Sequence, residues 1–202
     1  MSSGERRSEA VEAALDLAAH SNPEDITTSA IAARMRLSQG ALFRHFATKD
    51  AIWQGVMEWV SERLLSRIDR LAGAESDPLD ALEAMFLGHV DFVAEHPGVP
   101  RMVMGQLQRA GDTPVKRMAR TLMESYSTRL RRILSSARDE GVVRSDLDID
   151  AASALFLGMI QGLVVQHLMH GESMRMRADA PAIFVIYRAG LLASSTVGED
   201  RK

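Results

Sequence analysis

The chain has 202 residues, of which 46% are hydrophobic and 25% are charged, and it contains no cysteine. This composition excludes a disordered polymer, a collagen and a disulfide-stabilised mini-protein, and the missing thiols exclude cysteine-ligated zinc, iron–sulfur clusters and thiol catalysis. The net charge of -3 gives no general electrostatic reason to expect nucleic acid or a membrane as a partner. Residues 1–10 are polar and lack the apolar core of a signal peptide, which favours a cytoplasmic protein.

Apolar residues recur every three or four positions from the start of the chain, which predicts three short helices in its N-terminal quarter. The first helix ends before Pro23, because proline lacks an amide proton and clashes with the preceding turn. Thr27 or Thr28 can cap a second helix with its hydroxyl. Ser38 can cap a third helix, only two turns long, over residues 39–46.

A long amphipathic helix is expected from Lys49 to about residue 71, with Thr48 as its cap. Five further helical patterns follow, and the last is expected to start at Pro181, because proline suits the first turn of a helix. Their expected ranges are 79–96, 99–110, 115–137, a helix to about 169 capped by Asp148 or Asp150, and 181–193. With no strand pattern or repeat, the sequence predicts an all-α fold in which the long helix joins a domain at 1–50 to one at 51–202.

A basic window lies within the N-terminal domain of this acidic chain. Residues 27–49 contain Arg34, Arg36, Arg44 and Lys49 and no aspartate or glutamate. A short basic run is more often a solvated helix face than a binding site. Here, however, it coincides with two short capped helices joined by a tight turn, which is the pattern of a helix-turn-helix that binds double-stranded DNA.

The second helix of such a motif enters the major groove with its N-terminal residues. Gln39 can pair bidentately with adenine, while Gly40 and Ala41 let the backbone approach the duplex, and Ala41 can touch a thymine methyl. Arg36, in the turn, can read a guanine or bind a phosphate. The remaining residues expected at the DNA, mainly on phosphates, are Thr27, Thr28, Ser38, Phe43, Arg44, His45 and Lys49.

The run from Ile31 to Phe46, followed by Thr48-Lys49-Asp50-Ala51-Ile52, resembles the DNA-binding domain of the TetR (tetracycline-repressor) family of bacterial transcriptional regulators. The resemblance covers about residues 9–60. It implies an all-helical homodimer whose N-terminal domain binds DNA and whose divergent C-terminal domain binds an inducer and dimerises. Two positions depart from the family pattern, since Arg36 replaces a frequent glycine and Phe43 replaces the usual tyrosine, which removes one hydrogen-bond donor to a phosphate.

A protein that senses a small molecule needs a cavity, and the helices of the second domain are the place to expect one. Twelve methionines supply flexible side chains for an adaptable apolar wall, although most methionines simply fill gaps in a core. His89 and Tyr126 fall on apolar stripes, where a buried polar ring needs a partner. The residues expected to bind the effector are Arg63, Phe86, His89, Val93, Met102, Gln108, Met123, Tyr126, Met159 and Gln161.

The segment 151–171 contains no aspartate, glutamate, lysine or arginine, and it includes the glycine pair Gly158 and Gly162. Its glutamines and histidines make it too polar for a membrane span. We expect instead a helix that packs with the last helix against a second copy of the chain, in a two-fold four-helix interface. The residues expected there are Phe156, Gly158, Gly162, Val165, His167, Phe184, Tyr187 and Leu191.

The sequence therefore favours a ligand-responsive transcriptional regulator, a repressor by the family's common mode, that binds a palindromic operator as a homodimer and is released by a small hydrophobic effector. No cofactor is expected. The alternatives are an all-helical enzyme that uses the same pocket, although no catalytic motif is found, and a constitutive architectural DNA-binding dimer. A metal site at His167, His170 and Glu172 is disfavoured, since no second shell supports those ligands.

Overall fold

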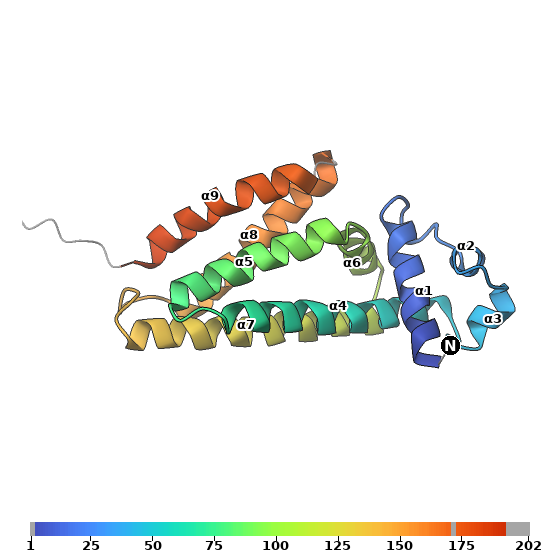
Figure 1. The fold of residues 1–202 in the computed structure, drawn as a ribbon, viewed down its shortest axis with the longest axis horizontal. Coiled ribbons are helices and arrows are strands. Elements are labelled where there is room, and N and C mark those ends of the chain that lie inside the picture. Colours follow the sequence, from blue (N-terminus) through green and yellow to red (C-terminus); the bar gives the residue numbers. More distant parts are fainter. Residues whose placement is uncertain (1–2, 171–172, 193–202) are drawn as a thin grey trace, which may run out of the picture.

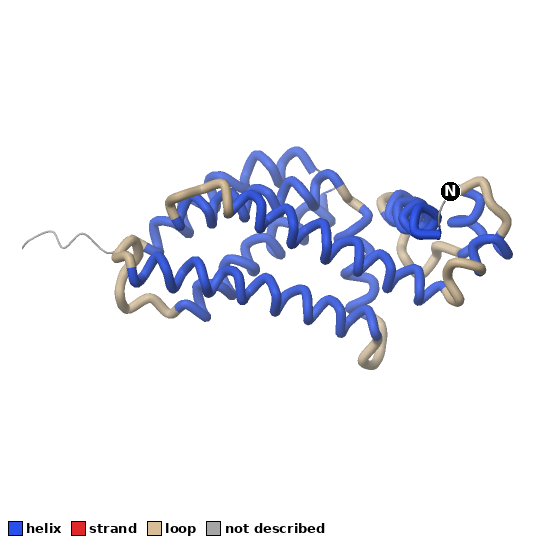
Figure 2. The backbone as a smooth tube through the Cα atoms, turned by 60° about the horizontal axis from the view of Figure 1, so that its bottom comes forward, coloured by secondary structure: helices blue, strands red, loops and turns tan. Residues whose placement is uncertain are grey.

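The computed structural model describes residues 3–170 and 173–192, and all regular secondary structure within these residues is helical (Figure 2). The all-α prediction is confirmed. In chain order the helices are α1 (Ser3–Ala18), α2 (Thr28–Arg34), α3 (Gln39–Phe43), α4 (Lys49–Ala72), α5 (Pro78–Glu95), α6 (Gly98–Gln108), α7 (Pro114–Asp139), α8 (Ile149–His170) and α9 (Ser173–Leu191).

The molecule is elongated, with α1, α2 and α3 gathered at one end and the remaining helices forming the body (Figure 1). α4 begins beside α3 and runs along the body next to α7, so it belongs to both parts. α5 packs on α4 and α7, and α9 packs on α5 and α8. α4 therefore connects the body to the end that carries α3.

Side-chain caps define the short helices at the N-terminal end. The hydroxyls of Thr27, Ser38 and Thr48 accept from the amides of Ala30, Ala41 and Ala51 at 3.0, 3.2 and 3.1 Å. Thr27 rather than Thr28 is thus the cap of α2, and Thr28 is its first helical residue. α3 ends at Phe43, earlier than the predicted boundary at residue 46, because the chain must turn back so that Phe46 can reach the core.

The start of the last helix was predicted wrongly. α9 begins at Ser173, and Pro181 lies inside it instead of in its first turn. Pro181 is on the exposed side of α9, while a buried stripe of the same helix continues on both sides of the proline. This packing keeps the segment helical despite the missing amide. The buried stripe of α9 is Met176, Ala180, Phe184, Tyr187 and Leu191.

An aromatic cluster forms the centre of the body, where α5, α7, α8 and α9 meet. Phe86 lies 5.5 Å from Phe156 and 5.6 Å from Phe184, measured between ring centroids. Tyr187 lies 5.8 Å from Phe156, and its hydroxyl donates to the carbonyl oxygen of Ala152 at 3.0 Å. Each large ring is buried, so this cluster contributes on the order of several kcal/mol to folding and holds the four helices in register.

The two ends of the molecule are joined at two further places besides α4. The start of α6 lies so close to the end of α1 that a Cβ atom added at Gly98 would sit 2.0 Å from the carbonyl oxygen of Leu15. After α6, the Arg109 guanidinium donates to the carboxylate of Asp50, in the first turn of α4, at 2.8 Å. The segment from α6 to α7 therefore contacts the N-terminal domain directly.

α8 is long and apolar enough to cross a membrane by length and composition alone. In the fold it packs against α5, α7 and α9, and Phe156, Ile160 and Leu163 are buried between them. The remaining sides of α8 are exposed and uncharged between Ala151 and His170.

Candidate DNA interface and effector cavity

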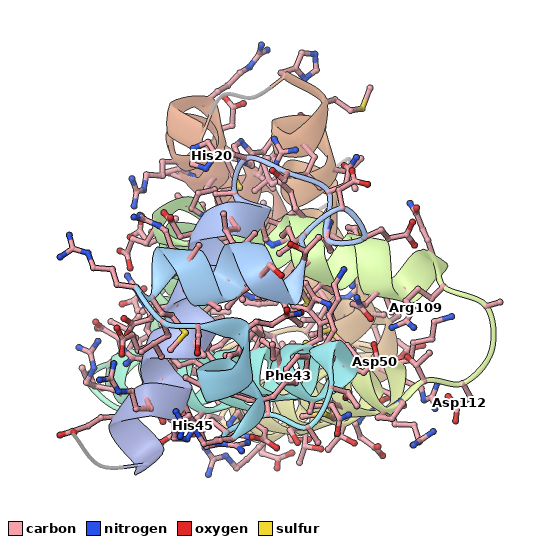
Figure 3. The ribbon with its side chains drawn as sticks, turned by 90° about the vertical axis from the view of Figure 1, so that its right-hand side faces the viewer. His20, Phe43, His45, Asp50, Arg109 and Asp112 are labelled. Carbon is pink, nitrogen blue, oxygen red and sulfur yellow. The ribbon has the colours of Figure 1, made fainter. Side chains whose placement is uncertain are left out.

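The exposed end of the N-terminal domain is built from α2, the turn after it and α3 (Figure 3). Gln39, Gly40, Phe43 and Arg44 are exposed there, and His45 is half-buried. Leu42 points the other way into the core, which fixes the orientation of the short α3. All eleven residues predicted at the DNA belong to this end: Thr27, Thr28, Arg36, Ser38, Gln39, Gly40, Ala41, Phe43, Arg44, His45 and Lys49.

The turn between α2 and α3 is made by Arg36, which has a φ angle of 57°. Its amide donates to the carbonyl oxygen of Ala33 at 3.0 Å, and the amide of Leu37 donates to Ala32 at 2.9 Å. A non-glycine residue in this left-handed region costs about 1–2 kcal/mol. The Arg36 guanidinium is exposed and forms no hydrogen bond or ion pair with the described residues, so its charge is available to an anion.

Two of the predicted DNA-contacting side chains are held by the protein itself. The Gln39 amide donates from Nε2 to the hydroxyl of Thr28 at 2.7 Å, which ties α3 to α2. The Lys49 ammonium donates to the carbonyl oxygen of Glu24 at 2.8 Å. Partial burial, followed by the nearby Arg109, lowers the pKa of Lys49. Both side chains must exchange or share these bonds to contact a duplex.

A cavity of about 600 Å³ lies in the body between α4, α5, α6, α7 and α8. Its inner wall, from α4 and α5, is buried, whereas Leu107, Arg120, Gln161 and Val165 are exposed and form its mouth. The size is within the range of sites for drug-sized ligands. The other wall residues are Met57, Val60, Leu64, His89, Phe92, Val93, Val99, Pro100, Val103, Met104, Lys116, Ala119, Leu122, Met123, Leu157, Ile160 and Val164.

His89 is the polar residue of the inner wall. Its side chain is 9% exposed, and its Nδ1 atom is buried with no hydrogen-bond partner. Burial lowers the pKa of His89 to about 4, so the ring is neutral at pH 7. The ring lies 5.4 Å from that of Tyr126, whose hydroxyl is likewise buried without a partner. Burial raises the pKa of Tyr126, which also stays neutral.

A second cleft, of about 690 Å³, lies at the opposite end of the body between the end of α4, the start of α5 and the end of α7. Two of its charged side chains pair with each other, since Arg129 donates to both carboxylate oxygens of Asp69 at 2.6 and 2.8 Å. The Arg129 hydrogen bond lowers the pKa of Asp69. A charged, internally paired cleft suits an apolar ligand less well than the cavity that contains His89.

Two family models match this chain. Residues 10–56 match the model of the bacterial regulatory proteins of the tetR family, and residues 78–183 match that of the tetracyclin repressor-like C-terminal domain. The second match alone spans more than half of the chain. The chain belongs to the TetR family. It is a helix-turn-helix transcriptional regulator with a ligand-binding C-terminal domain.

Relatives with similar sequences include nucleoid occlusion factors. The nucleoid occlusion factor SlmA of Vibrio cholerae is 28% identical over 158 residues, which cover 78% of this chain and 81% of that protein. SlmA of Marinomonas sp. is 25% identical over 169 residues, covering 83% and 85% of the two chains.

Solved structures share the fold at low sequence identity. The fatty acid degradation regulator FadR of Bacillus halodurans superimposes with a TM-score of 0.83 at 16% identity, covering 92% of this chain and 96% of that one. FadR of Bacillus subtilis, solved in complex with stearoyl-CoA, gives 0.80 at 16% identity, with 91% and 98% covered. The ketosteroid regulator KstR2 of Mycobacterium tuberculosis gives 0.76 at 20% identity, with 93% and 95% covered.

Part of the set predicted for the effector lies in the cavity of this TetR-family chain. His89, Val93, Met123 and Gln161 line it. The other predicted residues do not line it, because their helices present them elsewhere: Phe86, Met102 and Tyr126 are buried in the surrounding core, Arg63 lies over the Trp59 ring at 4.7 Å, Gln108 is exposed at the end of α6, and Met159 is half-buried on α8.

Sequence reasoning missed the α4 side of the cavity, formed by Met57, Val60 and Leu64, and the two cations Lys116 and Arg120. The sequence predicts α4 only as a long amphipathic helix. Periodicity marks the face of a helix that leaves water, and the same pattern arises whether that face meets a neighbouring helix or a cavity. A usable signal was the spacing that places Lys116 and Arg120 on the same helical stripe as Ala119 and Met123.

Of the eight residues predicted for the dimer interface, five are buried within the protomer and three are exposed on the outward face of α8. Phe156, His167, Phe184, Tyr187 and Leu191 are buried within the protomer, so their side chains are not offered to a partner. Gly158, Gly162 and Val165 are exposed as expected of that surface. The large apolar side chains actually exposed on these two helices include Leu155 at 57%, Met169 at 74%, Val185 at 61% and Ile186 at 74%.

No group of three histidine, aspartate or glutamate side chains that could hold a metal ion occurs within residues 3–170 and 173–192. Of the disfavoured trio, Glu172 lies outside the described residues. His170 Nδ1 is hydrogen-bonded to the carbonyl oxygen of Gln166 at 2.9 Å, while His167 is buried with Nδ1 unpartnered.

Proposed function

We propose that this chain is a ligand-responsive repressor that binds a palindromic operator as a homodimer and is released when a small hydrophobic effector fills the cavity. The observation that carries the proposal is that the segment 107–116 both lines the cavity and contacts the DNA-binding end. Leu107 and Lys116 line the cavity, and Arg109, between them in sequence, bonds to Asp50 beside Lys49 (Figure 3).

This geometry supplies a route for coupling. An occupant that displaces α6 or the start of α7 changes the position of Arg109, and with it the first turn of α4, which follows α3 in the chain. In a two-fold dimer the two copies of α3 must enter successive major grooves about 34 Å apart. The effector need only prefer the protein conformation in which this spacing is lost, and DNA then weakens effector binding by the same factor.

We place the dimer contact on the outward face of α8 and α9. Between Ala178 and Ile186 every exposed side chain is uncharged. The charged residue of this stretch, Asp179, is half-buried. Gly158 and Gly162 leave open space above α8, since a Cβ atom at either would meet nothing within 4 Å. A second copy of α8 can therefore approach closely. The set that faces outward is Leu155, Gly158, Gly162, Val165, Met169, Val185 and Ile186.

The cavity supports an apolar effector of substantial length. Most of its wall is aliphatic or thioether, and burial of such surface against a ligand contributes about 25 cal/mol per Å². FadR of Bacillus subtilis, whose fold this chain shares, is described with stearoyl-CoA. We therefore choose stearoyl-CoA as the first effector probe.

A second candidate function is a DNA-binding dimer without effector control. The similarity to nucleoid occlusion factors favours this alternative. The cavity favours the repressor, because a mainly apolar cavity of this size is typical of a small-molecule site and has no role in a purely architectural dimer. Release of DNA by a ligand distinguishes the two functions.

The test begins with selection of genomic fragments bound by the full chain, followed by fluorescence anisotropy on the selected site. Lys49→Ala is expected to weaken binding to every sequence and to reduce the slope of the logarithm of the binding constant against the logarithm of salt concentration by about one. Gln39→Ala should instead change the preferred base, with a loss of about 1–3 kcal/mol in discrimination between bases. Arg132→Ala removes a cation at the far end of α7 and is the matched control.

Sequence-selective, salt-sensitive binding that stearoyl-CoA reverses supports the repressor. Selective binding that no acyl ligand reverses supports the dimer without effector control. If wild-type protein prefers no sequence over another, it does not act as an operator-binding regulator.

A further inference from the structure

The inner wall of the cavity contains a polar group with nothing to bind. Within the described residues His89 forms no hydrogen bond, and its Nδ1 atom is buried and unpartnered. An unsatisfied buried atom loses its hydration without gaining a partner, so a buried histidine normally has one. His89 lines the cavity, and its buried Nδ1 atom is out of reach of a ligand in this ring orientation, so a partner from the cavity must meet Nε2, which also has no hydrogen bond within the described residues.

The neighbours of His89 define the chemistry of that partner. Its ring packs against the Tyr126 ring, and the wall beside it continues with Phe92 and Val93. No carboxylate or cation belongs to this inner part of the wall. A neutral imidazole offers one donor and one acceptor, which matches a hydroxyl or a carbonyl oxygen. A carboxylate at this depth would lose its hydration without gaining a counter-ion.

The opposite end of the cavity has the complementary character. Lys116 and Arg120, one turn apart on α7, are the charged residues of the wall and lie toward its mouth. Both already have polar partners in the protein: the Lys116 ammonium donates to the carbonyl oxygen of Arg109, and the Arg120 guanidinium pairs with Asp112 at 2.6 Å. Asp112 and Arg120 are exposed, so water screens their ion pair and an anion at the mouth can take over these cations.

We propose that the effector is an amphipathic molecule with an anionic group at the mouth, beside Lys116 and Arg120, and a neutral hydroxyl or carbonyl oxygen at the buried end, hydrogen-bonded to His89. This inference rests on the proposed function only in taking the cavity as the effector site. A plain saturated acyl chain fills the apolar part of the cavity but leaves His89 unsatisfied. An oxygen at the far end of the chain removes that cost.

The test compares palmitic acid with ω-hydroxypalmitic acid, and lauric acid with ω-hydroxylauric acid, by calorimetric titration of the full-length wild-type protein without DNA. We expect the ω-hydroxy acid of the better-fitting length to bind at least about tenfold more tightly than its parent acid. His89→Leu should bring the two affinities within about twofold of each other. Met123→Leu, an apolar change in the same wall, is the matched control and should keep the preference.

The cation end is tested separately. Arg120→Ala should weaken both acids of a pair by a similar factor, about threefold to tenfold, and leave their ratio unchanged. A variant that changes the ratio instead would place the hydroxyl at the mouth and overturn the proposed orientation.

Equal affinity of parent and ω-hydroxy acid in wild-type protein, tighter binding of the parent, or binding of neither pair overturns the inference. Equal affinity would mean that a water molecule already satisfies His89. Because the comparison uses wild-type protein, it stands even if His89→Leu does not fold. Because no DNA is present, a failure of operator binding would overturn the proposed function and leave the ligand preference as measured.

Discussion

Arg36 combines a backbone cost with a charge at the DNA-binding end. Its left-handed conformation, with φ at 57°, makes the turn that separates α2 from α3. Glycine adopts this conformation without a Cβ penalty, so arginine is a poor choice for the fold alone. The exposed guanidinium, free of partners in the described residues, is the compensating feature if it contacts a phosphate.

Arg36→Gly is therefore expected to change stability and DNA affinity in opposite directions. Relief of the left-handed penalty, reduced by the greater chain entropy of glycine, should raise the free energy of unfolding by about 0.5–1 kcal/mol. Loss of the charge should weaken DNA binding and reduce the salt slope by about one ion. Chemical denaturation and anisotropy against salt measure the two effects.

The matched control is Arg34→Gly, at the last residue of α2. It has helical geometry and an exposed ion pair with Asp16 at 2.6 Å, so glycine there should lower the free energy of unfolding by about 1 kcal/mol. A loss of stability in Arg36→Gly equal to that in Arg34→Gly would show that the turn is not strained by its side chain.

At the scale of elements, the sequence is informative wherever the determinant is local. Ser38 and Thr48 cap the helices that their positions predict, because a hydroxyl and an amide three residues later need no other part of the chain. Pro181 misled the prediction of α9 because the packing of Phe184 and its neighbours against α5 and α8 outweighs one missing hydrogen bond. Local pattern contains no measure of that packing.

The same limit applies to the candidate site. The DNA-binding end follows from adjacent residues and could be predicted from the sequence as one continuous surface. The cavity wall is drawn from five helices, so its membership depends on the rotation of each helix about its own axis. An error of one position separates exposed Val185 from buried Phe184, and it exchanges the outward, proposed dimer face for the core.

The contact between α1 and α6 allows a prediction about how the two domains are held together. A Cβ atom at Gly98 would lie 2.0 Å from the carbonyl oxygen of Leu15 and 3.1 Å from the amide nitrogen of Ala19, both rigid backbone atoms of the α1 end. Gly98→Ala must push α6 away from α1. We expect a loss of about 1–3 kcal/mol in the free energy of unfolding, measured by urea denaturation.

Gly105→Ala is the control on the same helix. Its Cβ would lie 3.1 Å from the ring of Pro23, a contact that a shift of a few tenths of an ångström relieves, and alanine improves helix propensity by up to about 1 kcal/mol. Its stability should stay within about 0.5 kcal/mol of the wild type. Equal stability of the two variants would mean that α6 moves freely relative to α1.

At the scale of the whole molecule, operator binding depends on both the DNA-binding end and the surface that joins the two protomers. A single α3 of five residues offers few base contacts, and tight operator binding requires two copies held at a fixed separation. That separation is set by whatever surface joins the protomers. Exposed apolar side chains as large as Met169 and Ile186 on neighbouring helices support the proposal that this face joins the protomers.

Ile186→Glu should consequently convert the dimer to monomers and lower operator affinity. Ile186 is 74% exposed in the protomer, so the substitution leaves the protomer's own core unchanged, while in a two-fold interface it buries unpaired carboxylates near each other. Size-exclusion chromatography with light scattering should give the monomer mass. Affinity for the full palindrome should fall to that for an isolated half-site, at least about a hundredfold.

Ala74→Glu introduces the same charge at an exposed residue of the loop between α4 and α5, outside the α8–α9 face and the cavity wall, and it should remain dimeric with full operator affinity in the absence of ligand. The comparison also separates two explanations for weak DNA binding. If Ile186→Glu stays dimeric and binds the operator as the wild type does, the protomers meet elsewhere, and the spacing of the two α3 helices must be set by another surface. If both variants become monomeric, added negative charge rather than the position of Ile186 causes dissociation.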